Sequence, residues 1–149
     1  MIFPLSTQYA IRALIHLAQI PQGMYGTVDQ IAGDEGISPG FLAKILQRLE
    51  RTGLLRSRSG TMGGFCLRAP AGEISLMDVI EVQHQKSVCA LHECSDDDPC
   101  AMHDEWKELQ TRIIGYFEQT TISDLVDALD KKKRPRGCRP QDARRGCVH

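Results

Sequence analysis

The sequence predicts a mainly α-helical protein: a winged helix-turn-helix with a long dimerisation helix and a cysteine-bearing loop. Between residues 6 and 53, apolar residues recur at helical spacing in three segments, and the repeat then changes to that of two short extended runs around a glycine-rich turn. Three helices followed by a hairpin are the pattern of a winged helix-turn-helix. A small helical bundle with an unrelated hairpin is the alternative.

The first two helices have recognisable ends. The first opens at Ser6 or Thr7, which are both good N-cap residues. The second begins at Thr27 with Gln30 three residues later, which is the spacing of a capping box. Gly36 can end this helix in the left-handed conformation.

The third helix has the clearest start. Ser38 stands at the N-cap position, and Pro39 suits the first helical position because the N–H that proline lacks has no partner there. The helix ends before Gly53. Its apolar stripe, which we expect to be buried, consists of Leu42, Ile45, Leu46 and Leu49.

Two short extended runs, residues 54–59 and 65–68, then flank Gly60, Gly63 and Gly64. This arrangement predicts a β-hairpin that serves as the wing. Cys66 lies in its second strand, where we expect it to behave as a small buried hydrophobic residue.

Positive charge gathers on the third helix and the hairpin. Residues 1–68 carry seven Lys or Arg and four Asp or Glu, a net charge of +3. A helix in the major groove needs polar groups for base edges and positive charge for phosphates. Each charge alone is better explained as part of a solvated surface, but the combination of the fold pattern with the net charge of +3 favours double-stranded DNA as the partner. The predicted contacts are Ser38, Lys44, Gln47, Arg48, Arg51, Arg58 and the backbone at Gly63 and Gly64.

The charge pattern divides the chain into segments with different roles. Residues 69–130 have a net charge of −11, and residues 131–149 have a net charge of +7. We expect a winged-helix domain over 1–84 and a cysteine-bearing loop that binds a metal cluster over 85–102. A dimerisation helix and a short terminal helix follow over 103–130, and a disordered basic tail over 131–149.

The segment after residue 102 predicts a long helix with a wide apolar stripe. A small domain has few other residues to cover this stripe, so pairing with the same helix of a second chain would bury it. Packing on the first helix of the same chain is the alternative. The stripe consists of Trp106, Leu109, Ile113, Tyr116 and Phe117.

Three cysteines and two histidines fall within the fifteen residues 89–103. The candidate metal ligands are Cys89, Cys94, Cys100 and His103, and His92 could take the place of His103. No C-x2-C pair is present, so the usual zinc-finger and thioredoxin-like motifs are absent. Three thiolates with one further donor fit an iron–sulfur cluster. Zinc bound by the same four residues and a thiol switch remain open alternatives.

Two further classes of protein are not favoured. Arg12 and His16 interrupt the N-terminal apolar segment, which is therefore neither a signal peptide nor a membrane span, and we expect a cytoplasmic protein without a membrane partner. No catalytic triad pattern or nucleotide-binding loop is present, so an enzyme is not expected.

These segments together resemble the Rrf-two family of transcription regulators. The resemblance covers residues 1 to about 130 and rests on "LSTQYAIRALIHLA", "ISPGFLAKILQRLERTGLL", "GTMGGF", the three cysteines and "HDEWKELQTRIIGYFEQTTISDL", in that order. It implies a homodimeric regulator in which an iron–sulfur cluster, with the 2Fe–2S form favoured over 4Fe–4S, senses redox, iron or nitric oxide status. The family's three cluster cysteines match Cys89, Cys94 and Cys100, and His103 matches the fourth ligand of some members.

The chain departs from the family pattern at three places. Four residues separate Cys89 from Cys94, where the histidine-ligated members have five. Gln8 stands where the nitric-oxide-sensing members have an acidic ligand, which argues against that coordination. Ser59 stands where the family has a wing arginine, and neighbouring Arg58 is the candidate to replace it.

Overall fold

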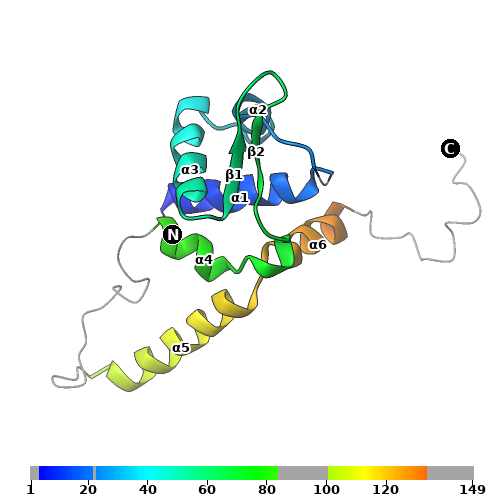
Figure 1. Ribbon diagram of the computed structural model, residues 1–149. Helices are drawn as coiled ribbons and strands as arrows, with labels where there is room; N and C mark the ends of the chain where they lie inside the picture. The colour runs from blue at the N-terminus through cyan, green and yellow to red at the C-terminus, as the bar shows by residue number, and fades with distance from the viewer. Residues whose placement is uncertain (1–3, 22, 84–100, 134–149) are drawn as a thin grey trace, which may run out of the picture.

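The computed structural model describes residues 4–21, 23–83 and 101–133, and each statement below concerns these residues. The architecture is the predicted winged helix-turn-helix with three further α-helices among the described residues (Figure 1). In chain order the elements are α1 (Leu5–Gln19), α2 (Val28–Glu35), α3 (Pro39–Arg51), β1 (Leu55–Arg58), β2 (Gly64–Leu67), η1 (Ala71–Glu73), α4 (Leu76–Gln83), α5 (His103–Gln119) and α6 (Ile122–Lys133).

Helix α1 is the centre of the core. It packs against α2, α3, α4, α6 and β2. Ala10, Ala13 and Leu14 on α1 have no exposed surface. Because alanine has the smallest side chain that still favours a helix, two alanines three residues apart let neighbouring elements approach the α1 backbone closely.

The start of α1 differs from the prediction, which placed the cap at Ser6 or Thr7. Pro4 occupies the N-cap position, and its carbonyl oxygen accepts hydrogen bonds from the amides of Thr7 and Gln8 at 3.1 and 3.3 Å. Thr7 is wholly buried inside the helix. The helix therefore begins two or three residues earlier than the capping pattern indicated, and Thr7 is a buried residue of its first turn instead of its cap.

The predicted ends of α2 and α3 are largely confirmed. The amide of Gln30 donates to Thr27 Oγ1 at 3.2 Å and the amide of Thr27 donates to Gln30 Oε1 at 3.1 Å, which completes the capping box. Gly36 ends α2 with φ of 64°. Ser38 stands at the N-cap of α3, although its side chain makes no capping hydrogen bond. All four residues of the predicted α3 stripe are buried: Leu42, Ile45, Leu46 and Leu49.

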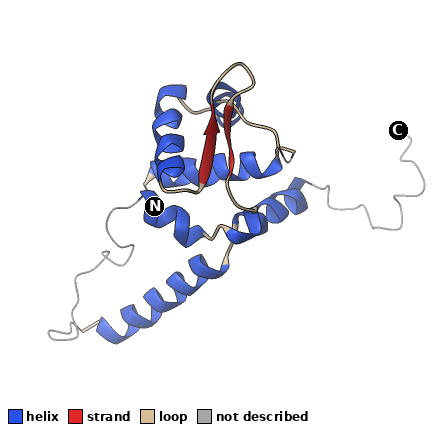
Figure 2. Ribbon diagram, viewed as in Figure 1, coloured by secondary structure: helices blue, strands red, loops and turns tan. Residues whose placement is uncertain are grey.

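The wing is an antiparallel hairpin that stands beside α3 (Figure 2). Leu55 pairs with Leu67, and Arg56 pairs with Cys66. Since paired residues share a face of the sheet and successive pairs alternate, the leucines point to the core while Arg56 and Cys66 point away from it. Gly26 extends the sheet on the β2 side, because its amide and carbonyl exchange hydrogen bonds of 2.9 and 2.8 Å with Phe65.

Helices α4 and α6 start side by side. The amide of Leu76 donates to the carbonyl of Thr120 at 2.8 Å, and the amide of Ile122 donates to the carbonyl of Ile74 at 2.9 Å. Ser75 caps α4, with Asp78 as its partner. Helix α6 continues through Lys133, so residues 131–133, which were expected in the tail, are helical; residues 134–149 lie outside the described part.

Helix α5 spans His103–Gln119 and begins where the sequence predicted, directly after residue 102. It leads away from the other elements in Figure 1 and packs on α4, while α6 covers α1. Phe117 is buried, but Leu109 and Tyr116 are 47% and 58% exposed. A single chain therefore leaves much of the α5 stripe uncovered.

The start of α6 gives a prediction about pH. The Asp124 carboxylate accepts hydrogen bonds from the amide and the hydroxyl of Thr121 at 2.9 and 2.8 Å, which hold the pKa of Asp124 below its ordinary value of 3.8. Its contribution to stability is present above that ordinary value and is lost as the pH falls through the lower folded-state pKa. We expect Asp124→Ala to lower the Tm by about 2–6 °C at pH 7.

Thermal unfolding followed by circular dichroism between neutral and strongly acid pH measures this effect. The difference in Tm from the parent protein should shrink once the pH is below the ordinary pKa. Asp127→Ala, at an exposed position on the same helix, is the control and should not lower the Tm. Equal losses of Tm in the two variants at pH 7 would contradict the prediction.

Candidate nucleic-acid interface

The outer face of α3 carries the polar residues that the sequence assigned to DNA. Because the four apolar positions of α3 recur at helical spacing and face the core, the positions between them face outward. The exposed residues include every predicted contact on this segment: Ser38, Lys44, Gln47, Arg48 and Arg51. The acidic residue of α3, Glu50, accepts a hydrogen bond from the Ser57 hydroxyl of β1 at 2.6 Å. This bond fixes the wing to the helix and draws the carboxylate away from the basic face.

One of these residues has a partner on another helix. The Arg48 Nη1 donates to the Oε1 of Gln83, at the end of α4, over 3.4 Å. Local sequence patterns do not predict this pairing, because 35 residues separate Arg48 from Gln83.

A phenylalanine at the start of α3 was not predicted as part of the interface. Phe41 is 40% exposed and packs edge-to-face on Tyr9 of α1, with ring centroids 5.9 Å apart. An exposed apolar ring in the first turn of a reading helix can contact the methyl group of thymine. The predicted apolar stripe of this helix did not include Phe41, and only polar and charged residues were predicted as side-chain contacts to DNA.

Arg58 lies at the outer end of β1 and stacks on a residue that the sequence analysis did not single out. Its guanidinium carbon lies 5.9 Å from the centroid of the Tyr25 ring. A cation–π contact of this kind restrains the arginine without using its N–H donors. The wing therefore presents an oriented positive charge next to the α3 face.

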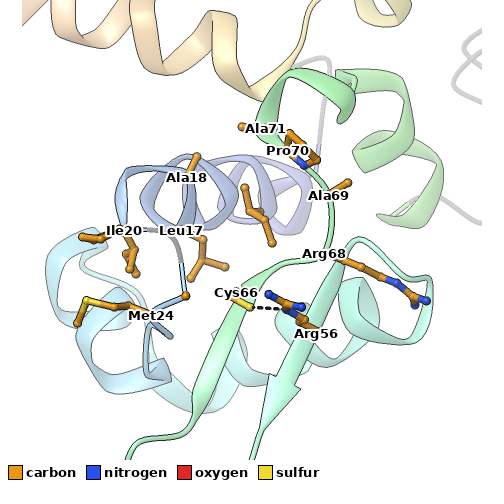
Figure 3. A pocket seen from close by; sticks show the side chains of 13 residues that line it. Leu17, Ala18, Ile20, Met24, Arg56, Cys66, Arg68, Ala69, Pro70 and Ala71 are labelled. Atoms are coloured by element: carbon orange, nitrogen blue, oxygen red, sulfur yellow. Dashed lines mark hydrogen bonds between the residues drawn. The ribbon is translucent and has the colours of Figure 1, made fainter.

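Cys66 is not the buried hydrophobic residue that was expected. It is half-buried on the outer face of the hairpin, where its Sγ accepts a hydrogen bond of 3.0 Å from Arg56 Nε (Figure 3). This bond and the charge interactions with Cys66 and Tyr25 raise the pKa of Arg56 above its ordinary value. Both side chains line a cavity of about 370 Å³ whose apolar wall includes Leu17 and Ile20. The expectation failed because strand register, which the sequence did not fix, decides which residues of β2 face the core.

The glycines of the wing have a structural reason to be glycine. A Cβ on buried Gly63 would collide with the carbonyl oxygen of Arg58. Gly64 has φ of 143°, and a Cβ there would collide with the carbonyl of Gly26. The exposed tip of the wing consists of Gly60, Thr61 and Met62.

The predicted metal ligands are only partly within the described residues. Cys89, Cys94 and Cys100 lie outside them. His103 is the first residue of α5 and is half-buried. Within the described ranges, no three His, Cys, Asp or Glu side chains are grouped so that they could hold a metal ion.

A basic reading helix beside an arginine-bearing wing defines a winged-helix DNA-binding protein. The Rrf2 family model, described as an iron-dependent transcriptional regulator, matches residues 5–128. The chain therefore belongs to the Rrf2 family of transcription regulators, and the family predicted from the sequence motifs is confirmed.

Individual relatives agree with this assignment. A helix-turn-helix regulator of Aquifex aeolicus is 35% identical over 142 residues, 91% of this chain and 98% of its own length. The regulator IscR of Citrobacter koseri is 31% identical over 150 residues, 91% of each chain. The structure of CymR, the global cysteine regulator of B. subtilis, matches with a TM-score of 0.77 at 22% identity over 85% of this chain and 96% of that one, which supports the fold.

These comparisons also decide the general class of activity. The family and its relatives are transcription regulators, so the chain is a DNA-binding regulator and not an enzyme. Among residues 4–21, 23–83 and 101–133, none of the helices combines the length and the hydropathy that crossing a bilayer requires.

The wing geometry gives a prediction about stability. Gly64→Ala should lower the free energy of unfolding by about 2 kcal/mol or more, because alanine is strained at this φ and its Cβ meets the backbone of Gly26. The matched control is Gly33→Ala, inside α2, where nothing lies within 4 Å of the added Cβ.

Urea unfolding at equilibrium measures both variants. Gly33→Ala should raise the free energy of unfolding by about 0.5–1 kcal/mol, because alanine favours the helix over glycine. A Gly64→Ala protein as stable as the parent would show that the hairpin does not hold this conformation.

Proposed function

We propose that the protein is a homodimeric transcription regulator of the cytoplasm that senses redox, iron or nitric oxide status through an iron–sulfur cluster. Cys89, Cys94 and Cys100 bind the cluster, His103 is the fourth ligand, and the 2Fe–2S form is favoured. The residues that contact the DNA operator are Ser38, Lys44, Gln47, Arg48, Arg51, Arg58, and the backbone at Gly63 and Gly64.

The observation that carries the proposal is the position of His103. It is the first residue of α5 and directly follows the three-cysteine segment in the sequence. The same helix keeps an uncovered apolar stripe in the single chain, with Leu109 and Tyr116 about half exposed. A ligand at the first turn of this helix therefore connects the proposed sensor to the proposed dimer contact.

The donor set fits an iron–sulfur cluster. Three thiolates and one imidazole satisfy the preference of such clusters for sulfur ligands with occasional nitrogen replacement. A cluster supplies reversible electron transfer and sensitivity to oxidants, which a zinc ion lacks. The similarity to IscR of Citrobacter koseri supports this choice, and the structural likeness to CymR supports the fold alone.

The α5 stripe supports a two-fold dimer. An isologous contact places the same residues of both chains against each other, which is the commonest arrangement of a homodimer. Two reading helices then face successive major grooves about 34 Å apart. A change at the start of α5 alters the separation of the two α3 helices and so controls operator binding.

The cluster is tested by purifying the full chain without oxygen and measuring iron, sulfide and zinc on one sample with its visible spectrum. We expect a coloured protein with equal iron and sulfide. Cys100→Ala and His103→Ala should lose or alter the visible bands, because each removes a ligand. Cys66→Ala is the matched control, since it removes a cysteine of the wing, and its spectrum should equal that of the parent.

Two other outcomes would contradict the proposal that an iron–sulfur cluster is the sensor. A colourless protein with one zinc per chain would favour the zinc alternative. A protein without metal even after cluster reconstitution would favour a thiol switch.

The wing contact is tested with Arg58→Ala. We expect about a tenfold loss of operator affinity, and a decrease of about one in the slope of log affinity against log salt, because one phosphate contact is removed. The control is Arg12→Ala, an exposed arginine of α1 that pairs with Glu35 at 2.7 Å. Anisotropy titrations at several salt concentrations measure both, and equal slopes for the two variants would exclude Arg58 from the interface.

A further inference from the structure

The bond between Arg48 and Gln83 joins the DNA-reading helix to the helix that leads into the cysteine segment. Arg48 is exposed on the outer face of α3, and its Nη1 lies 3.4 Å from Gln83 Oε1. Gln83 is the last residue of α4 and is only 8% exposed. A largely buried amide thus holds the end of an exposed, flexible arginine.

The bond to Arg48 leaves the other polar group of the Gln83 amide without a hydrogen-bond partner among the described residues. A guanidinium can only donate hydrogen bonds, so the amide must turn its oxygen toward Arg48. Its Nε2 is then buried without a hydrogen-bond partner among the described residues. A buried, unpaired N–H donor is unfavourable, and a leucine or methionine of similar volume would avoid the penalty. Among the described residues, the stability of the fold therefore does not explain why a glutamine stands here.

The geometry points to Gln83 as a positioning residue for DNA binding: it holds Arg48 in place for a backbone phosphate of the operator. The bond uses one side of the guanidinium and leaves the other N–H groups for a phosphate. Fixing a long side chain in advance lowers the conformational entropy that is lost when DNA binds.

Gln83 is also close in sequence to the cysteine segment, which gives its contact with Arg48 a role in regulation. This regulatory role rests on the proposed function. Cys89 follows Gln83 by six residues in the sequence. If the end of α4 shifts when the cysteine segment changes, the hydrogen bond between Arg48 and Gln83 changes with it. The effect then reaches α3 within the same chain. This route does not depend on movement of the dimer helix.

The test is a double-mutant cycle on the full chain with Gln83→Leu, Arg48→Met and the double variant. We expect Gln83→Leu to lower operator affinity about threefold to tenfold, without lowering the Tm. The slope of log affinity against log salt should fall in Arg48→Met, which loses a charge at the phosphate. It should stay close to that of the parent in Gln83→Leu, where Arg48 keeps its charge but loses its restraint. In the Arg48→Met protein, the Gln83→Leu substitution should have no further effect.

Two controls keep the outcome interpretable. Gln83→Met repeats the test with an unbranched side chain in case leucine does not fit and the Tm falls. Arg51→Met removes a neighbouring exposed arginine of α3, and its effect should add to that of Gln83→Leu. Equal losses of operator affinity from Gln83→Leu in the parent and in the Arg48→Met protein would overturn the proposal, as would a parent-like affinity of the Gln83→Leu protein.

The same titrations on protein as isolated without oxygen and after iron removal separate this inference from the proposed sensor. If the parent protein binds the operator equally in both preparations, the proposed sensing mechanism fails, while the cycle still decides the role of Gln83. If the parent affinities differ, that difference should shrink in Gln83→Leu. If the ratio of the operator affinities of the two preparations is the same in the parent and in Gln83→Leu, the regulatory role is overturned.

Discussion

The close packing of α1 is the constraint on which the rest of the structure depends. Ala10 and Ala13 have no exposed surface, and α3, α4, α6 and β2 all meet this one helix. Because protein interiors are packed as densely as organic crystals, a larger side chain at either alanine would displace several neighbours at once. The direction of the reading helix and the place where the later helices attach are therefore both set by the same few contacts.

The attachment of the later helices follows from a small number of backbone hydrogen bonds. The chain between α5 and α6 pairs with the chain before α4 through the bonds of Leu76 with Thr120 and of Ile122 with Ile74. Ile74 and Ile122 are buried at this junction. Since α6 returns to cover α1 while α5 packs on α4, the junction turns the free part of α5 outward. A helix with a partly uncovered apolar stripe therefore extends from the DNA-binding core.

The wing is held by contacts that also arrange its charges. Glu50 binds Ser57, Gly26 pairs with Phe65, and Tyr25 lies under Arg58. The loop between α1 and α2 thus orients an arginine of the wing that is more than thirty residues away in the sequence. These contacts join segments that are far apart in the sequence, as does the contact of Arg48 with Gln83. Together they fix the arrangement of positive charges on the face formed by α3 and the wing.

The sequence by itself determined the elements and the family of this protein. Helical spacing predicted the buried stripe of α3 and the long helix α5, and the Thr27 capping box predicted the start of α2, because these features depend on residues within a few positions of one another. Only the tertiary structure decided the early start of α1, the outward orientation of Cys66, the packing of α5 on α4 and the partner of Arg48. Each of these depends on register or on contacts between segments far apart in the chain, which local spacing does not specify.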